Sequence, residues 1–298
     1  MTGLFYLNFI ISIIVYITIF TKKIKTMKKI FTLTIALSLF LISCTSNESE
    51  VSSEVGLLCV QKVQKNSSGT TIRETNFNYN GNKIVNAITN FNNSIIENKY
   101  YYTEDLITKI DSYENNILLI THNFTYNSQQ NLIQHVLIDH LNNEGSKFVY
   151  NYINDMSITE YIYEGDLLNQ NQLTQTASIL LTKTNGEITT FRHQVNGSSY
   201  SSVSNFFYDS KNNYMKNVLG YGKLTLLAGT NYSWETYKHD SNYCSQNVTQ
   251  LQSSTISGNQ RNINSLYTYN SNNYPISETE THTLGATSYT NNYWYYYN

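Results

Sequence analysis

The sequence predicts an all-β protein: a single large, curved antiparallel meander sheet, either a half-barrel or a barrel-like closed sheet, with hairpin repeats of about 24 residues. Three observations predict this fold. The chain has 27 Tyr and a single Pro, and Tyr and Thr favour strands while the abundant Asn and Ser favour turns. Asn-Gly pairs interrupt runs in which polar and apolar residues alternate. A short unit of aromatic-x-Tyr, polar turn and apolar return strand recurs along the chain.

The recurring unit predicts the strand order. Tyr79, Tyr102, Tyr126 and Tyr150 are separated by 23, 24 and 24 residues, which fits two strands and two turns per repeat. Within one unit, alternation places Phe124 and Tyr126 on the same face of the sheet. Copies of the unit read "FNYNGNKIVNAI" (77–88), "YYYTEDLITKI" (100–110), "FTYNSQQNLIQHV" (124–136), "FFYDSKNNYMKNV" (206–218) and "YTYNSNNYPISE" (267–278).

The turns can be placed from short polar sequences. Asn80-Gly81 and Asn185-Gly186 are typical of two-residue type I′ hairpins, and Glu164-Gly165-Asp166 is expected to close another repeat. The stretch 213–229 fits either a short helix or a buried strand-loop, and both interpretations remain open. No Pro/Gly-rich linker divides residues 55–298, so these are predicted to form one all-β repeat domain.

The N-terminal region predicts targeting to the cell envelope. From Met27 the chain reads "MKKIFTLTIALSLFLISC", with a basic pair, an apolar run and a cysteine at position 44. This pattern resembles a bacterial lipoprotein signal peptide at 27–44, in which Cys44 is lipidated and becomes the mature N-terminus. Residues 45–54 are then expected to be a polar tether. Thr45 is not the aspartate that often retains lipoproteins in the inner membrane, which favours the outer membrane.

A second apolar run precedes this signal, from Gly3 to Phe20. It is close to the length that a membrane helix requires. Residues 1–26 are therefore either an extra membrane segment or an upstream extension that results from a start codon placed too early. We favour the second interpretation, because a complete signal peptide of ordinary length begins at Met27.

Several functional classes lack support in the sequence. The formal net charge of −2 gives no attraction to nucleic acid. There is no GxSxG, Gly220-x-Gly222 lacks the third glycine of a dinucleotide site, and no EF-hand loop occurs, so we expect no cofactor and no metal. The segments are also too polar and irregular for the lipid-facing band of a membrane-spanning β-barrel.

The titratable residues are expected to be structural. His135 and His140 are five residues apart and point to opposite faces of a strand, so we expect surface or turn histidines, and the same for His122. Glu278 and Glu280 share one face and are expected to form a solvated edge. No catalytic residues can be assigned, and the chain is expected not to be an enzyme.

Exposed aromatic residues are the binding candidates. Tyr100, Tyr101, Trp294 and Tyr295 could stack on a glycan or peptide, or they could form cross-strand ladders that stabilise the sheet. Cys59 and Cys244 could form a disulfide in an oxidising envelope, or they could both remain thiols.

The repeat units and the aromatic C-terminus are similar to known families. "FTYNSQQNLIQHV" and "FFYDSKNNYMKNV" resemble the tyrosine-aspartate (YD) repeat, with Asn in place of Asp in most copies. Together with the lipoprotein signal, the units resemble uncharacterised lipoproteins of the Bacteroidetes, some of them grouped as a domain of unknown function with a porin-like antiparallel fold. The resemblance implies this architecture and brings no catalytic residues.

These observations predict a lipid-anchored cell-envelope protein, placed at the outer membrane and facing the periplasm or the exterior. Its role is expected to be non-enzymatic binding or structural, with a glycan, a peptide or another envelope protein as partner. Two alternatives remain open. An envelope hydrolase would show a deep cleft with facing carboxylates or a histidine–carboxylate pair, and a carrier of hydrophobic ligands would show an apolar, unfilled interior.

Overall fold

The computed structural model describes residues 56–197, 201–229, 244–255 and 260–298. The predicted signal peptide, the lipidation site at Cys44 and the division of residues 1–54 lie outside this part of the chain. The residues from Val55 to Asn298 form one compact unit.

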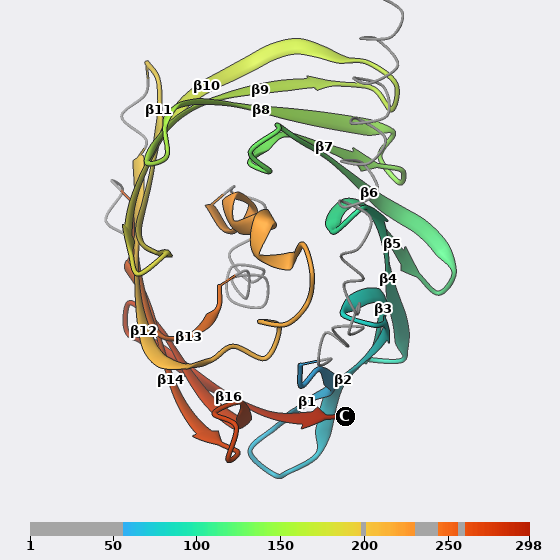
Figure 1. The fold of residues 1–298 in the computed structure, drawn as a ribbon, viewed down its shortest axis with the longest axis vertical. Coiled ribbons are helices and arrows are strands. Elements are labelled where there is room, and N and C mark those ends of the chain that lie inside the picture. Colours follow the sequence, from blue (N-terminus) through green and yellow to red (C-terminus); the bar gives the residue numbers. More distant parts are fainter. Residues whose placement is uncertain (1–55, 198–200, 230–243, 256–259) are drawn as a thin grey trace, which may run out of the picture. The chain divides into compact units, whose positions relative to one another are not determined.

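The unit is a closed antiparallel barrel of 16 strands in which each strand pairs with the next along the chain (Figure 1). The first and last strands also pair, with Val63 opposite Trp294, and this contact closes the barrel. The predicted all-β meander is therefore confirmed, in its closed form. The strands are β1 (Cys59–Lys65), β2 (Thr71–Asn80), β3 (Lys83–Phe91), β4 (Ser94–Thr103), β5 (Leu106–Glu114), β6 (Ile117–Tyr126), β7 (Leu132–Asp139), β8 (Glu144–Asn154), β9 (Ser157–Gly165), β10 (Gln170–Thr184), β11 (Glu187–Val195), β12 (Ser201–Asn212), β13 (Gln246–Thr255), β14 (Gln260–Tyr269), β15 (Pro275–Leu284) and β16 (Thr287–Tyr297).

The hairpin turns use residues that tolerate a positive φ. Asn185 and Gly186 both have positive φ, of 52° and 87°, as the predicted type I′ turn requires. The first predicted hairpin also exists, but its turn is shifted by one residue: Asn80 ends β2 and pairs with Lys83, and Gly81 has the positive φ. Asn92-Asn93 and Asn115-Asn116 form turns with positive φ at both residues, which explains part of the high Asn content.

One tyrosine in most of the repeat units has a specific role, and it is usually the second aromatic residue of the unit, with Tyr267 as the exception. On six even-numbered strands, an inward tyrosine donates its hydroxyl hydrogen bond to a backbone carbonyl of the preceding strand. We call these six residues the tyrosine collar. Its bonds are Tyr79 to Cys59, Tyr126 to Ile107, Tyr152 to Leu132, Tyr208 to Ile188, Tyr267 to Val248 and Tyr297 to Pro275, with oxygen–oxygen distances of 2.7–3.1 Å. The collar explains the sequence repeat, with Tyr152 rather than the predicted Tyr150 as its member on β8.

Replacing Tyr126 by phenylalanine is expected to lower the free energy of unfolding by about 1 kcal/mol, because it removes one bond to the Ile107 carbonyl and changes little else. Urea denaturation measures this change. Tyr296→Phe is the control, since Tyr296 is exposed on the outer face and its replacement should have little effect. Equal effects of the two substitutions would contradict a stabilising role for the collar.

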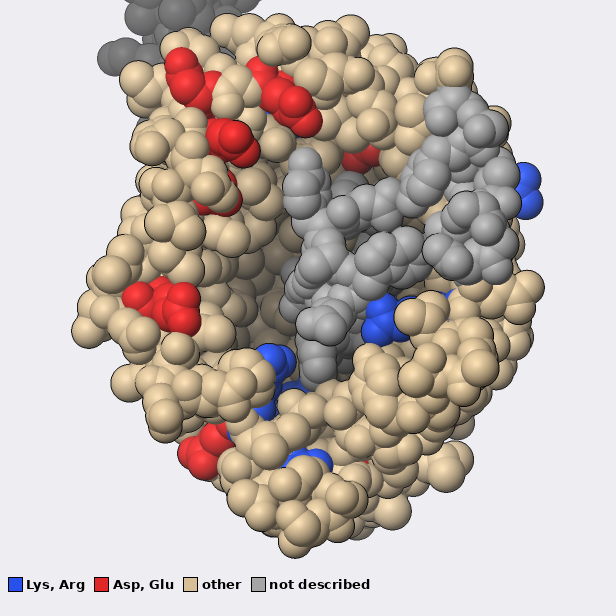
Figure 2. All heavy atoms as spheres, turned by 180° about the vertical axis from the view of Figure 1, so that it is seen from behind, with Lys and Arg blue, Asp and Glu red and all other residues tan. Residues whose placement is uncertain are grey.

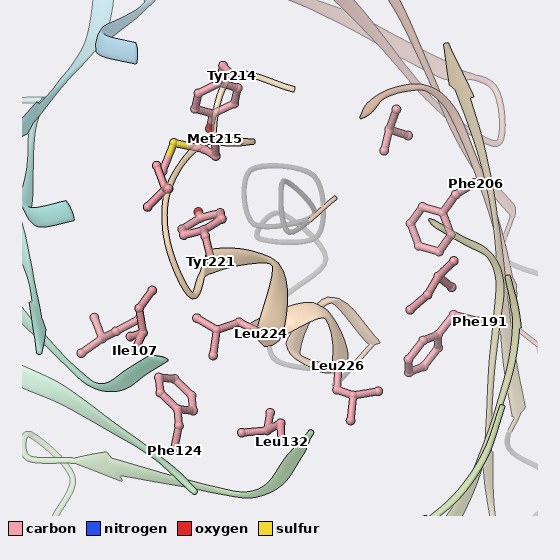
Figure 3. Close-up of a cluster of buried hydrophobic side chains, with 14 of the residues drawn as sticks. Ile107, Phe124, Leu132, Phe191, Phe206, Tyr214, Met215, Tyr221, Leu224 and Leu226 are labelled. Atoms are coloured by element: carbon pink, nitrogen blue, oxygen red, sulfur yellow. The ribbon is translucent and has the colours of Figure 1, made fainter. Parts of the chain in front are cut away.

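A segment between β12 and β13 lies inside the barrel (Figure 1). We call residues 213–227 the plug; they include most of a 3₁₀ helix, η1 (Tyr221–Gly229). Its apolar side chains point toward the walls on different sides (Figure 3). Each of the two interpretations of 213–229 is correct in part: a short helix forms in the second half, and the segment is buried as the strand-loop interpretation predicts. The buried plug side chains are Tyr214, Met215, Val218, Tyr221, Leu224 and Leu226.

Three contacts to backbone groups hold the plug in place. The Asn217 amide donates to the Leu57 carbonyl over 3.0 Å, and the Leu219 N–H donates to the Asn82 carbonyl over 3.0 Å. Tyr102, the equivalent of the collar tyrosines on β4, departs from their pattern and donates to the Leu219 carbonyl over 3.3 Å. The repeat is therefore altered at the strand where the plug contacts the wall.

The two faces of the barrel wall differ in polarity. Inward positions carry Phe, Tyr, Ile and Leu that pack with the plug, together with a smaller set of polar residues. The outward positions between them are mixed: Asn, Thr, Gln and Ser are the most numerous, and apolar residues such as Ile153, Leu173 and Leu180 are more frequent on β8–β10. On β2, β6, β13, β14 and β15 the polar outward residues include Asn76, Asn78, Asn123, Thr125, Gln250, Gln252, Asn262, Asn264, Thr279 and Thr281.

Candidate functional site

The inner wall of β8 to β11 carries a buried histidine–carboxylate pair. His193 Nε2 lies 2.9 Å from Glu160 Oε2, and Tyr150 is directly opposite Glu160 in the register of β8 and β9. All three side chains are at most 3% exposed. The other ends of these groups have no hydrogen-bond partner: Tyr150 OH, Glu160 Oε1 and His193 Nδ1 are buried and unpaired. We call Tyr150, Glu160 and His193 the inner polar site.

A stack of rings lies beside this site. His135 on β7 packs against Phe148 and Phe124 with ring centroids 5.3 and 5.1 Å apart, and its Nε2 lies 2.9 Å from His122 Nδ1. Burial lowers the pKa of His122 to about 4 and lowers the pKa of His135 well below its usual value, because the interior disfavours a charged imidazole. Both rings are therefore neutral at neutral pH.

The inner face of β14 to β16 carries a second polar network. Glu278 accepts hydrogen bonds from Ser265 (2.7 Å) and Tyr295 (2.5 Å). His282 links an Arg261 Nη2 atom at 3.0 Å to Glu280 at 3.1 Å. Burial raises the pKa of Tyr295 well above its usual value, so this hydroxyl remains a donor. Glu278 is engaged within the protein, whereas His282 Nε2 lies close to Glu280 but forms no hydrogen bond among the described residues.

Lys62 on β1 points into the barrel and meets three tyrosine rings. Its Nζ lies 4.6 Å from the ring centroid of Tyr293, 5.1 Å from that of Tyr214 and 5.5 Å from that of Tyr295. A cation over several ring faces is a favourable arrangement. Since Tyr214 belongs to the plug, this contact also attaches the plug to β1 and β16.

The four predicted binding aromatics are not brought together. Tyr100 and Tyr295 point inward, where Tyr100 packs on the core and Tyr295 is buried. Tyr101 on β4 and Trp294 on β16 point outward with three strands between them, and a lysine covers each ring, with Lys109 Nζ 4.6 Å and Lys65 Nζ 4.7 Å from the ring centroids. The alternative of structural aromatic contacts fits these positions better than a shared stacking platform.

Two predictions about titratable residues are wrong. His135 is buried inside the barrel and His122 is largely buried, whereas both were expected on the surface or in turns. Glu278 and Glu280 line the interior at 5% and 2% exposure and do not form a solvated edge. Closure of the sheet is the physical reason, because it buries one complete face of every strand. Residues directly opposite each other on paired strands share one face of the sheet. His135 lies opposite Phe124 and Glu278 lies opposite Tyr267, so both follow an inward aromatic residue into the interior.

The cysteines and possible metal ligands give no site. Cys59 and Cys244 are both thiols, and burial raises the pKa of each to about 12, which disfavours the thiolate that forms a disulfide. Their pairing remains a prediction without support from the structure. In the described ranges, no group of three or more His, Cys, Asp or Glu residues could hold a metal ion. Across the same residues, no helix is long and apolar enough to cross a membrane.

The buried pair does not form a nucleophile-activating group with its neighbours. A hydrolase of the histidine–carboxylate type needs a hydroxyl or thiol bonded to the second imidazole nitrogen. His193 Nδ1 has no such partner among the residues that the structure describes. The pair alone therefore does not support the hydrolase alternative, and the inner polar site is better described by its unused hydrogen-bonding capacity.

Comparison with known proteins gives a distant likeness of fold. No protein-family model matches the chain, and no curated protein matches it. Among solved structures, a porin-like protein from Bacteroides uniformis is similar, with a TM-score of 0.45, 12% identity, and coverage of 80% of this chain and 95% of that one. A porin-like protein from Bacteroides vulgatus gives a TM-score of 0.37 and 9% identity, over 81% and 99% of the two chains.

Proposed function

We propose that the protein is a lipid-anchored binding protein of the cell envelope whose barrel stands in water. The polarity of the two wall faces carries this proposal. A barrel that spans a membrane presents an apolar band to lipid and has a polar interior. Here polar amides and hydroxyls outnumber apolar residues at the outward positions, and the buried aromatic and aliphatic cluster lies inside the barrel.

The interior also argues against an open channel or an empty apolar carrier. Leu224 and Leu226 of the plug pack with Ile107, Phe191 and other wall residues in a single buried cluster (Figure 3). A membrane attachment is still expected from the sequence, through a lipid on Cys44. The proposed molecule therefore consists of an acylated N-terminus, a polar tether of residues 45–54, and a barrel that faces the aqueous phase.

Solubility and mass spectrometry test this proposal together. The Cys44→Ala protein, processed or truncated at residue 44, is expected to be monodisperse without detergent, since its outer wall is polar. Wild-type protein purified from host membranes is expected to have the mass of a chain that begins at an acylated Cys44, and Thr45→Ala should behave like wild type.

Two results would contradict the proposal. A Cys44→Ala barrel that aggregates unless detergent is added would indicate a lipid-facing wall. A wild-type protein whose mass includes residues 1–43 would instead be attached to the membrane through the first apolar run. Cys44 would then carry no lipid.

A further inference from the structure

Four buried polar atoms on one side of the barrel interior lack hydrogen-bond partners. They are Tyr150 OH, Glu160 Oε1, His193 Nδ1 and the Nδ1 of the neighbouring His135. Buried polar groups are nearly always paired in folded proteins, and an unpaired group costs free energy. Such atoms, gathered on neighbouring strands from β7 to β11, indicate a partner that is not part of the described chain.

The chemistry of the inner polar site selects the class of this partner. The Tyr150 hydroxyl can donate and accept, and burial together with Glu160 keeps its pKa well above the usual value, so it retains its proton. A carboxylate oxygen accepts hydrogen bonds only, and the remaining imidazole nitrogen donates or accepts according to its tautomer. Hydroxyl groups match all three, because each hydroxyl both donates and accepts.

The surroundings add an apolar surface to this polar set. Phe148, two residues before Tyr150 on β8, points into the same side of the interior and stacks on His135. A sugar ring combines hydroxyl groups around its edge with C–H groups on its faces, which pack on aromatic rings. Seen from behind, the space-filling surface is hollowed within the ring of strands (Figure 2).

From this arrangement we propose that the inner wall of β8, β9 and β11 binds a small polyhydroxylated ligand of the sugar or sugar-alcohol class through Tyr150, Glu160 and His193. This inference rests on the proposed binding function and names the site and ligand class for it. The unpaired atoms would then be satisfied in the complex, so ligand binding should stabilise the fold.

The test uses the full mature protein and a panel of probes. The sugars and sugar alcohols are glucose, galactose, N-acetylglucosamine and mannitol, and a dipeptide and benzoate are the comparison probes. Thermal unfolding and ligand-observed NMR report binding. We expect at least one polyhydroxylated probe to raise the Tm of the wild type, and its Kd to rise at least tenfold in Tyr150→Phe and in Glu160→Gln. Tyr152→Phe is the matched control, since Tyr152 lies on the same strand face but donates to the Leu132 carbonyl.

The Tm without ligand separates binding from a purely structural role. Tyr150→Phe removes a hydroxyl that has no partner, so its ligand-free Tm should equal or exceed that of the wild type. A clearly lower Tm without any loss of sugar binding would assign the three residues to the fold and overturn the inference. Sugar binding that is unchanged in both variants would place the ligand elsewhere.

The remaining outcomes distinguish this inference from the proposed function. If the dipeptide or benzoate binds and no polyhydroxylated probe does, the ligand class is wrong while the binding function stands. If none of the probes binds, the inference is overturned, and the detergent-free solubility of the Cys44→Ala barrel still decides separately whether the protein is a water-facing envelope barrel.

Discussion

Replacing Gly220 by alanine is expected to destabilise the protein by about 2–5 kcal/mol, since it combines left-handed backbone strain with overpacking. Gly220 has a φ of +72°, and a Cβ atom there would lie 2.6 Å from the Asp105 carbonyl oxygen and 2.8 Å from the Ile107 nitrogen. Both neighbours are backbone atoms of the β4–β5 hairpin and cannot rotate away. The plug must therefore move from the wall, and the buried contacts around it weaken.

Comparison with Gly285→Ala separates the effect of the steric clash from the effect of the backbone strain. Gly285 has a similar φ of +58°, but no atom lies within 4 Å of the place that a Cβ atom would take, so its replacement should cost about 1 kcal/mol. Urea denaturation gives the two free energies, and limited proteolysis shows whether cleavage near residue 220 increases. Similar losses for the two substitutions would mean that the plug is not seated against the β4–β5 hairpin.

Acidification is expected to remove about 3 kcal/mol of stability through His122 alone. Its folded pKa is about 4 against 6.5 for the unfolded chain, and a shift of one unit corresponds to about 1.4 kcal/mol. Above pH 6.5 the imidazole is neutral in both states and has no effect. As the pH falls from 6.5 toward 4, the unfolded state takes up a proton that the folded state refuses, so the free energy of unfolding falls. His135 adds to the loss in the same direction.

Denaturation curves between pH 7.5 and pH 4 measure this dependence. The double variant His122→Phe/His135→Phe should be nearly insensitive to pH down to about 4.5, because rings of similar size replace the titrating groups. Asp111 affects the stability in a lower pH range than His122. Its pKa is lowered from 3.8 by hydrogen bonds from Lys109 and Thr121, against the opposing effect of burial, so its contribution is lost only below about pH 4. An unchanged slope in the double variant would assign the acid sensitivity to other groups.

The repeat made the fold class predictable, while the environment of individual side chains was less so. Spacing of Tyr79, Tyr102 and Tyr126 indicated the meander, and Asn185-Gly186 indicated a hairpin, since both depend on local residues. Alternation divides each strand into two faces, but it does not say which one is buried when both contain Tyr and polar residues. Glu278 and Glu280 were misjudged for this reason.

The inner polar site and the plug depend on contacts that local patterns do not encode. Glu160 and His193 meet across an intervening strand, at a separation of 33 residues, and each residue alone is ordinary in its own strand. The plug has no regular periodicity, since it buries side chains on several sides at once. Gly220 belongs to the Gly-x-Gly pattern that the sequence shows locally. Its role, however, depends on Asp105, which is more than 100 residues away in the sequence.

The pairing of β1 with β16 has a consequence for the order of folding. All other strand pairs join neighbours along the chain, and apart from β12 and β13, which flank the plug, they can form by short loop closures soon after synthesis. The closing pair joins Cys59 to Tyr297 and must wait until β16 has been synthesised. Until then the molecule is an open sheet with two unpaired edges, the state in which β-proteins are most exposed to aggregation. A circular permutant that joins β16 to β1 and opens another hairpin would move this late step to a different strand pair and leave the finished barrel the same.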